Sequence, residues 1–92
     1  METKKKVLIV EDEKNIVDIL CFNLRRAGYD TLEAYDGEEG LRKAITENPD
    51  LILLDVMLPK MIGFDVCKTL RAQGNNVPVI ILTAREEEAD KV

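Results

Sequence analysis

The stretch that decides the fold is Asp50-Leu51-Ile52-Leu53-Leu54-Asp55, a short apolar run closed by a carboxylate. Runs of this length and composition are typical of strands that are buried on both faces of a sheet. A second run, KVLIV at residues 6–10, ends in the same way, in Glu11-Asp12. Two such strands predict three acids at one edge of a sheet, and their mutual repulsion costs free energy unless something binds there.

Outward from this stretch, strands alternate with helices along the whole chain. Apolar runs predict strands at residues 6–11, 29–35, 50–55 and 77–83. Apolar residues at helical spacing predict helices between them, at residues 16–28, 36–49 and 64–74. Residues 83–92 have the pattern of the first turns of a fourth helix. Alternation with short connections requires a parallel sheet with right-handed crossovers, so we predict a doubly wound α/β fold.

Local signals support the helix boundaries. Gly28 and Gly74 follow the first and third helical patterns, where a glycine commonly ends a helix. Asp36, with Glu39 three residues later, is typical of a helix start. Asn48-Pro49 ends the second helix, because the residue before a proline disfavours helical backbone.

Composition limits the class of protein. The 92 residues allow one domain, residues 1–92, and 46% hydrophobic with 34% charged residues suits a soluble globular chain. A net charge of −5 argues against direct nucleic acid binding. No apolar stretch is long enough for a membrane span and no signal segment follows the start, so we expect a cytoplasmic protein.

Residue usage also narrows the chemistry. The chain has no histidine, which excludes histidine-based zinc sites and histidine general bases. The two cysteines, Cys21 and Cys67, lie within helical patterns without the spacing of metal ligands. We expect both to be reduced packing residues rather than a disulfide.

The three acids predict a cation site. In doubly wound sheets, ligands bind beyond the carboxyl ends of the strands. If the strands before Glu11-Asp12 and before Asp55 are neighbours, their backbones lie about 4.8 Å apart. Two unit charges at 4 Å then repel by roughly 4 kcal/mol at an effective dielectric of 20. Either an acid takes up a proton or a cation neutralises the cluster, and oxygen ligands favour Mg²⁺.

A divalent ion beside an aspartate also makes room for a phosphoryl group, because it offsets the negative charge that repels phosphate. Thr83, at the end of the strand at 77–83, adds a hydroxyl at the same edge. The alternative is that Asp12 caps the first helix and Asp55 caps a turn, since aspartate is common at both positions. The joint occurrence of four polar residues at strand ends favours a site.

The chain resembles the receiver domain of two-component response regulators over essentially its whole length. The resemblance rests on four motifs: VLIVEDE at 7–13, LLDVMLP at 53–59, GFDVC at 63–67 and ILTA at 81–84. Within the family, the sequence most resembles receivers that precede a winged-helix DNA-binding domain, which implies a role in transcription regulation. It also implies the flavodoxin-like (CheY-like) strand order 2-1-3-4-5.

The resemblance implies a role for each site residue. Asp55 matches the phosphoacceptor, which takes a phosphoryl group from a sensor histidine kinase with Mg²⁺. Asp12 matches the direct metal ligand, Glu11 the acid that holds the ion through water, and Met57 the residue whose backbone carbonyl ligates the metal. Thr83 matches the hydroxyl that contacts the phosphoryl group. Four residues around the site also match those usual in the family: Ala84, Pro59, Gly63 and Lys60. Ile62 differs, because a polar residue is frequent at its position.

The resemblance also implies elements that these 92 residues do not contain. Receivers have a fifth strand, which carries a phosphoryl-pairing lysine and an aromatic switch residue, and a fifth helix. We therefore expect an incomplete receiver with the order 2-1-3-4, which accepts a phosphoryl group poorly. The strand at 77–83 would be an open apolar edge, and part of the first helix would be uncovered at Ile16, Leu20 and Leu24. Such an edge recruits another strand, which predicts self-association.

Three interpretations compete. The first is a phosphoacceptor signalling module that is not an enzyme. The second is a truncated or engineered receiver fragment that acts as an assembly module with an impaired site. The third is a small phosphohydrolase with a nucleophilic aspartate, and it is disfavoured because such enzymes place another acid two residues after the nucleophile, where this chain has Met57.

Overall fold

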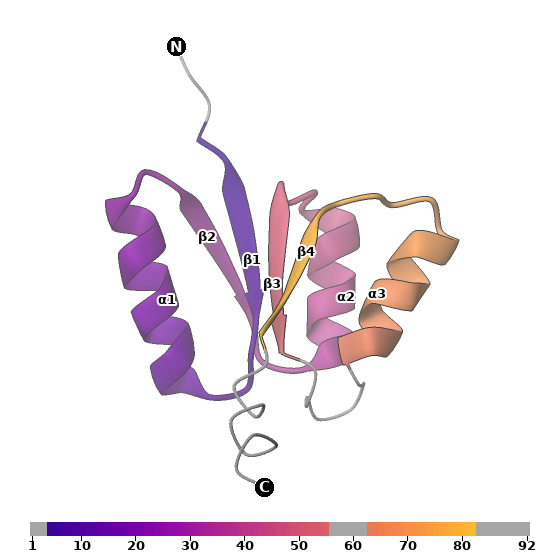
Figure 1. Ribbon diagram of the computed structural model, residues 1–92, viewed down its shortest axis with the longest axis horizontal. Helices are drawn as coiled ribbons and strands as arrows, with labels where there is room; N and C mark the ends of the chain where they lie inside the picture. The colour runs from indigo at the N-terminus through magenta and orange to yellow at the C-terminus, as the bar shows by residue number, and fades with distance from the viewer. Residues whose placement is uncertain (1–3, 56–62, 83–92) are drawn as a thin grey trace, which may run out of the picture.

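The computed structural model describes residues 4–55 and 63–82. These residues form alternating strands and helices (Figure 1). The strands are β1 (Lys6–Val10), β2 (Asp30–Ala34), β3 (Leu51–Asp55) and β4 (Val79–Leu82). The helices are α1 (Lys14–Arg26), α2 (Gly37–Thr46) and α3 (Gly63–Ala72). The helix expected at residues 83–92 and the loop at 56–62 lie outside the described residues.

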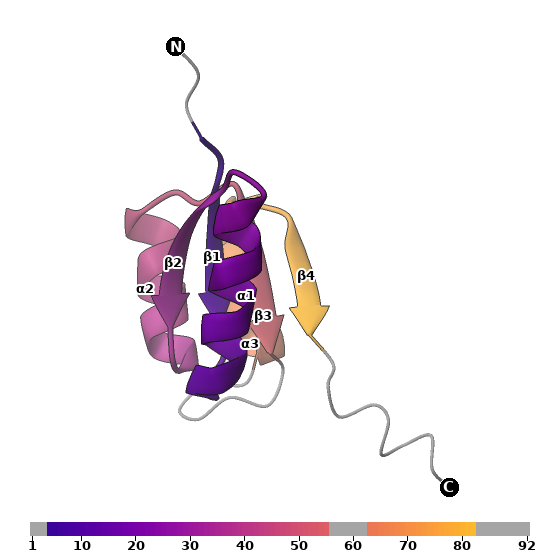
Figure 2. The same cartoon turned by 90° about the vertical axis from the view of Figure 1, so that its left-hand side faces the viewer.

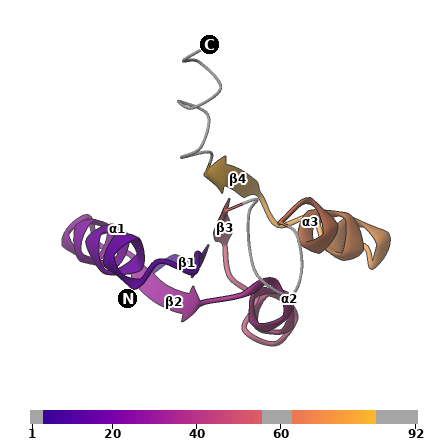
Figure 3. The ribbon, with the colours of Figure 1, turned by 90° about the horizontal axis from the view of Figure 1, so that it is seen from below.

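The strands form one parallel sheet in the order β2-β1-β3-β4. Helix α1 lies on one face of this sheet, and α2 and α3 lie on the other, as Figure 3 shows from below. The view in Figure 2 places β4 at the edge, on the far side of β3 from β1. The predicted doubly wound fold and the strand order 2-1-3-4 are confirmed, and β1, β2 and β3 are one or two residues shorter than the sequence suggested.

Each face of the sheet has its own apolar core, because successive side chains of a strand point to opposite faces. On the α1 face, the buried cluster consists of Val7, Ile9, Val17 and Cys21. On the other face it consists of Leu8, Val10, Ala34, Ala44, Ile52, Leu54, Val66 and Leu70. Strand β1 contributes to both cores, and Leu51 and Leu53 of β3 pack against the core of the α1 face, which explains why the two strands are continuously apolar rather than alternating.

The predicted ends of α1 and α3 and the predicted start of α2 are confirmed by their caps. Gly28 has a positive φ of 99°, and the N–H of Tyr29 donates to the Leu24 carbonyl at 3.0 Å, which closes the end of α1. Gly74 ends α3 in the same way, with φ 81°. At the start of α2, the N–H of Glu39 donates to Asp36 Oδ1 at 2.8 Å, as expected for an N-cap.

Two further expectations concern single residues. Both cysteines are free: Cys21 lies in the core of the α1 face, and Cys67 packs against the core of the opposite face, so both are packing residues as expected. Among the helices within 4–55 and 63–82, none combines the length and apolar character that crossing a membrane requires.

The α1 face is less completely covered than the other face. Ile16, Leu20 and Leu24 of α1 are only half-buried, as expected. On β4, the side chain of Ile80 is 52% exposed. The apolar surface of the described residues is therefore open where β4 forms the edge.

Candidate metal centre

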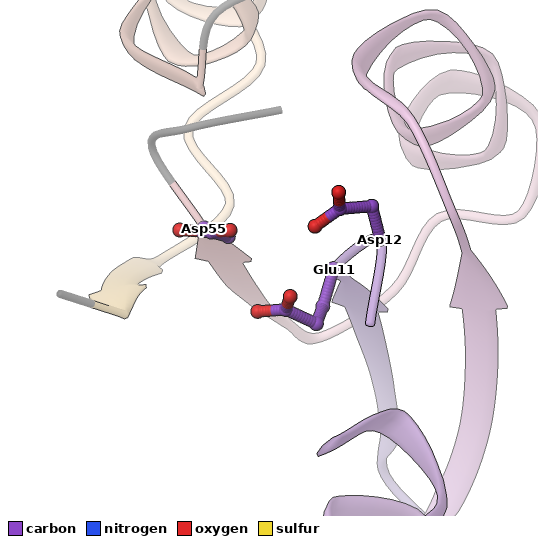
Figure 4. Close-up of side chains that lie close together, drawn as sticks. All are labelled: Glu11, Asp12 and Asp55. Carbon is purple, nitrogen blue, oxygen red and sulfur yellow. The ribbon is translucent and has the colours of Figure 1, made fainter. Parts of the chain in front are cut away.

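Two neighbouring strands bring the acids together. β1 and β3 are adjacent and parallel, and Val10 is level with Leu54 in their register. Glu11 follows Val10 directly and Asp55 follows Leu54, so both leave the sheet at its carboxyl edge. Asp12 comes one residue later, and Figure 4 shows its carboxylate turned toward the other two. One carboxylate oxygen from each of Glu11, Asp12 and Asp55 lies within 4.8 Å of the others.

The three acids differ in burial. The side chains of Glu11 and Asp55 are only 3% and 1% exposed, whereas Asp12 is exposed. Buried carboxylates without a compensating charge are costly, which is why such pairs either take up a proton or bind a cation. The cluster is thus open to solvent on the side of Asp12 and closed on the side of the sheet.

Glu11 is fixed by two backbone contacts. Its N–H donates to the Ala34 carbonyl at 3.0 Å, which completes the last pair of β1 with β2, Val10 with Ala34. Its carboxylate accepts the N–H of Glu13 at 3.1 Å. Burial raises the pKa of Glu11 to about 6, and the charges of Asp55 and Asp12 add to this effect while the Glu13 N–H opposes it. The repulsion expected from the sequence therefore acts on this carboxyl group.

The structure also tests the alternative in which Asp12 caps the first helix and Asp55 caps a turn. Helix α1 begins at Lys14, and its N-cap is Glu13, which has extended backbone and no side-chain cap. Asp12 precedes the N-cap, so the alternative in which Asp12 caps the helix is wrong. Asp55 is the last residue of β3, paired with Leu82 in the register of β4. Residue 56 lies outside the described part of the chain, so a turn after Asp55 is not tested.

The donor set suits a hard divalent cation. All three ligands are carboxylate oxygens, which Mg²⁺ prefers to bind at about 2.0–2.1 Å. Opposite ligands of one such ion are then about 4.2 Å apart, and adjacent ligands about 3 Å. A spread of up to 4.8 Å between the oxygens is slightly wider than this. The cluster therefore fits an ion that is held directly by some of the acids and through water by another.

Several predicted site residues lie outside the described residues. These are Met57, Thr83, Ala84, Pro59, Lys60 and Ile62. Leu82, which precedes Thr83, is level with Asp55 in the sheet. Gly63 is the first residue of α3. The contributions of Glu13 and Ala34 were not predictable from the sequence, because both act through backbone groups that any residue type supplies.

Comparisons with known proteins agree with this geometry. Residues 7–92 match the family described as the response regulator receiver domain. The alkaline phosphatase synthesis transcriptional regulatory protein PhoP of Bacillus subtilis is 59% identical over 88 residues, which cover 96% of this chain. The chain spans 37% of the length of that relative.

Solved structures show the same fold. The response regulator TrrA from Thermotoga maritima, in complex with Mg²⁺-BeF, is 34% identical with a TM-score of 0.84, and the match covers 96% of this chain and 76% of TrrA. The N-terminal domain of a response regulator receiver protein from Methanoculleus marisnigri is also 34% identical, with a TM-score of 0.85. That match covers 97% of this chain and 76% of the solved one.

Proposed function

This chain belongs to the response regulator receiver family, and we propose that its Asp55 accepts a phosphoryl group while Glu11 and Asp12 hold a Mg²⁺ ion beside it. As a receiver domain of a two-component response regulator, the chain is a signalling domain. Receiver domains obtain their phosphoryl group from histidine kinases, and we propose that such a kinase is the partner of this chain.

One observation carries the proposal: three carboxylates from two adjacent strand ends converge within 4.8 Å (Figure 4). Two of them are almost completely buried in a domain whose other buried side chains are almost all apolar. Such an arrangement is unfavourable for the chain alone, and a cation makes it favourable. The intact cluster therefore supports a working phosphoacceptor site rather than the vestigial site of the assembly interpretation.

Each residue of the site would have its own role in phosphoryl transfer. A carboxylate oxygen of Asp55 attacks the phosphorus of a phosphohistidine, a P–O bond forms, the P–N bond breaks, and the released imidazole nitrogen keeps the electron pair and takes up a proton. Bound Mg²⁺ would neutralise charge on the carboxylates and on the transferred group. Asp12 would hold the ion directly and Glu11 would hold it through water. By the family resemblance, the Met57 carbonyl would be a further ligand and the Thr83 hydroxyl would contact the phosphoryl group.

The wider role also rests on relatives. The Bacillus relative is named as a transcriptional regulatory protein, and this chain matches about a third of it. We infer that the present domain controls an output module of that kind when it is part of a longer protein. On the same grounds we propose that its place of action is the cytoplasm, where a kinase and a transcriptional output can both be reached.

The 92-residue chain has a second proposed property, self-association through β4. Within the described residues β4 pairs with β3 alone, and its exposed face carries Ile80. An apolar edge strand of this kind is a template for pairing with another chain. The occupant that we propose is a second copy of the chain, because two identical edges are self-complementary about a two-fold axis.

Beryllium fluoride tests the main proposal, because this phosphoryl analogue needs both an aspartate oxygen and a bound cation. We expect Mg²⁺ and beryllium fluoride together to shift amide NMR signals at the carboxyl ends of β1 and β3. Asp55→Asn is expected to abolish the shifts, and Asp65→Asn, an exposed aspartate on α3, to leave them intact. Equal shifts in the wild type and in Asp55→Asn would contradict the proposal.

A further inference from the structure

Two side chains of helix α2 bind the end of β2 on the edge that faces away from β1. Lys43 Nζ donates to the carbonyl of Glu33 at 2.6 Å. Glu39 Oε1 accepts the backbone N–H of Tyr35 at 2.9 Å. The two side chains also pair with each other, with Lys43 Nζ 3.3 Å from Glu39 Oε2 and each side chain 28% exposed. We call Glu39 and Lys43 the α2 clamp.

The α2 clamp lies opposite a contact that fixes the carboxylate cluster. The two backbone groups that it holds belong to the residues on either side of Ala34. Ala34 is the residue whose carbonyl accepts the N–H of Glu11 at 3.0 Å, on the inner side of the strand. The α2 clamp and Glu11 thus bind the backbone of residues 33–35 from opposite edges of β2.

Helix α2 also touches β1 directly in front of the cluster. A Cβ added at Gly40 would lie 2.7 Å from Val10 Cγ1, so the helix backbone approaches the strand very closely there. Val10 immediately precedes Glu11. Helix α2 therefore supports Glu11 in two ways. It packs against Val10, the residue before Glu11, and its clamp holds the end of β2, where Ala34 accepts the Glu11 N–H.

We propose that Glu39 and Lys43 are positioning residues for the carboxylate cluster, which hold the backbone of Glu11 in place for cation binding. The inference rests on the proposed Mg²⁺ site. A metal ligand works only when its supporting contacts hold it close to the productive geometry. Without the clamp, the end of β2 loses its outer contacts, and the hydrogen bond from Glu11 to Ala34 has a less rigid acceptor.

Glu39→Ala tests the proposal, and the chain offers a matched control in Glu38→Ala, an exposed glutamate in the same helical turn. Two quantities are measured: hydrogen exchange of the Glu11 amide without divalent cations, and the Mg²⁺ affinity by calorimetry. Glu39→Ala is expected to speed hydrogen exchange at the Glu11 amide and to bind Mg²⁺ about tenfold more weakly. This is the lower end of the loss in affinity seen when outer-shell partners of metal ligands are replaced. Glu38→Ala is expected to change neither quantity.

Two further variants separate positioning from general stability. Glu39→Gln keeps an acceptor for the Tyr35 N–H and is expected to restore most of the protection at Glu11. Lys43→Met removes the bond to Glu33 and serves as a second loss variant if Glu39→Ala folds poorly. A lowered melting temperature with unchanged exchange at Glu11 and unchanged Mg²⁺ affinity would overturn the proposal. A wild type that binds no Mg²⁺ would instead remove the proposed function, and the exchange measurement would still decide whether the clamp holds Glu11.

Discussion

At the scale of single residues, the three acids carry unequal shares of cation binding. Asp12 is the exposed member and faces the open side of the cluster, whereas Glu11 and Asp55 are buried. Its carboxylate is accessible to an incoming ion, and as the proposed direct ligand it contacts that ion without an intervening water. Asp12 is therefore the residue whose loss should affect affinity most.

We predict that Asp12→Ala weakens Mg²⁺ binding by about a hundredfold or more, because losing a direct ligand should cost at least as much as losing an outer-shell partner, which costs about ten- to a hundredfold. Glu13→Ala is the matched control, because Glu13 is the next residue, is exposed and makes no side-chain cap on α1. Its backbone N–H, which holds Glu11, is unchanged by the substitution. Isothermal calorimetry gives both affinities, and equal affinity in Asp12→Ala and the wild type would remove Asp12 from the site.

Glu11 predicts a pH dependence of stability in the absence of divalent cations. Its pKa is raised from 4.5 to about 6 in the folded chain, mainly by burial. The folded state holds this proton more tightly than the unfolded chain, so the free energy of unfolding falls as pH rises from about 4.5 to about 6. The loss amounts to roughly 2 kcal/mol, at 1.36 kcal/mol for each unit of pKa.

Urea denaturation at a series of pH values measures this effect. Glu11→Gln should remove the decrease, because its side chain does not titrate. Glu38→Gln, at an exposed position on α2, should retain it. If Glu11→Gln shows the same pH slope as the wild type, another group is responsible.

At the scale of elements, the start of α2 depends on one side chain. Asp36 accepts the N–H of Glu39 and has the extended backbone of an N-cap. We predict that Asp36→Ala lowers the free energy of unfolding by about 1 kcal/mol, the usual cost of losing such a cap. Urea denaturation measures the change. Glu38→Ala, which loses only a favourable charge near the helix dipole, should cost a few tenths of a kcal/mol, and equal losses would refute a specific cap.

The sequence predicted these elements well because each has a local signal. Continuous apolar runs mark β1 and β3, and glycines with positive φ end α1 and α3. The boundary of α2 was less accurate. The helix ends at Thr46, before the expected Asn48-Pro49, and Asn48 takes a positive φ of 50°. An asparagine tolerates that conformation, so the chain turns before the proline is reached.

The candidate site was predictable only in part. The convergence of Glu11, Asp12 and Asp55 follows from the position of each acid after a strand, once the strands are neighbours. The supporting contacts of Glu11 were not predictable, because they come from the backbone of Glu13 and Ala34.

The α2 clamp was predictable only in part. Asp36 and Glu39 mark a helix start, but the pattern does not show that Glu39 binds the N–H of Tyr35. The bond from Lys43 to the Glu33 carbonyl joins α2 to β2, and sequence spacing does not reveal such contacts.

At the scale of the whole molecule, the two edges of the sheet differ. The outer edge of β2 is occupied by the α2 clamp, and Arg25 Nε donates to Thr31 Oγ1 at 2.9 Å. Charged side chains at an edge hinder pairing with another chain. β4 is wholly apolar, and Ile80 is exposed. Association of the 92-residue chain should therefore proceed through β4 rather than β2.

We predict that the 92-residue chain forms dimers or larger assemblies at micromolar concentration. Ile80→Lys places a charge on the β4 edge and should shift the chain toward the monomer. Ile45→Lys is the matched control, because Ile45 is also exposed but lies on α2. Light scattering measures the mass in solution, and a monomeric wild type would show that β4 does not drive association.

The central claim is that Asp55 is a phosphoacceptor that depends on Mg²⁺, and phosphorylation by acetyl phosphate tests it most directly. The chain is incubated with and without Mg²⁺, and the modified residue is located by peptide mass spectrometry. We predict label on Asp55 only when Mg²⁺ is present, with none in Asp55→Asn, little in Asp12→Ala and normal labelling in Glu13→Ala. Label on another residue, or label on Asp55 that is independent of both Mg²⁺ and Asp12, would contradict the account.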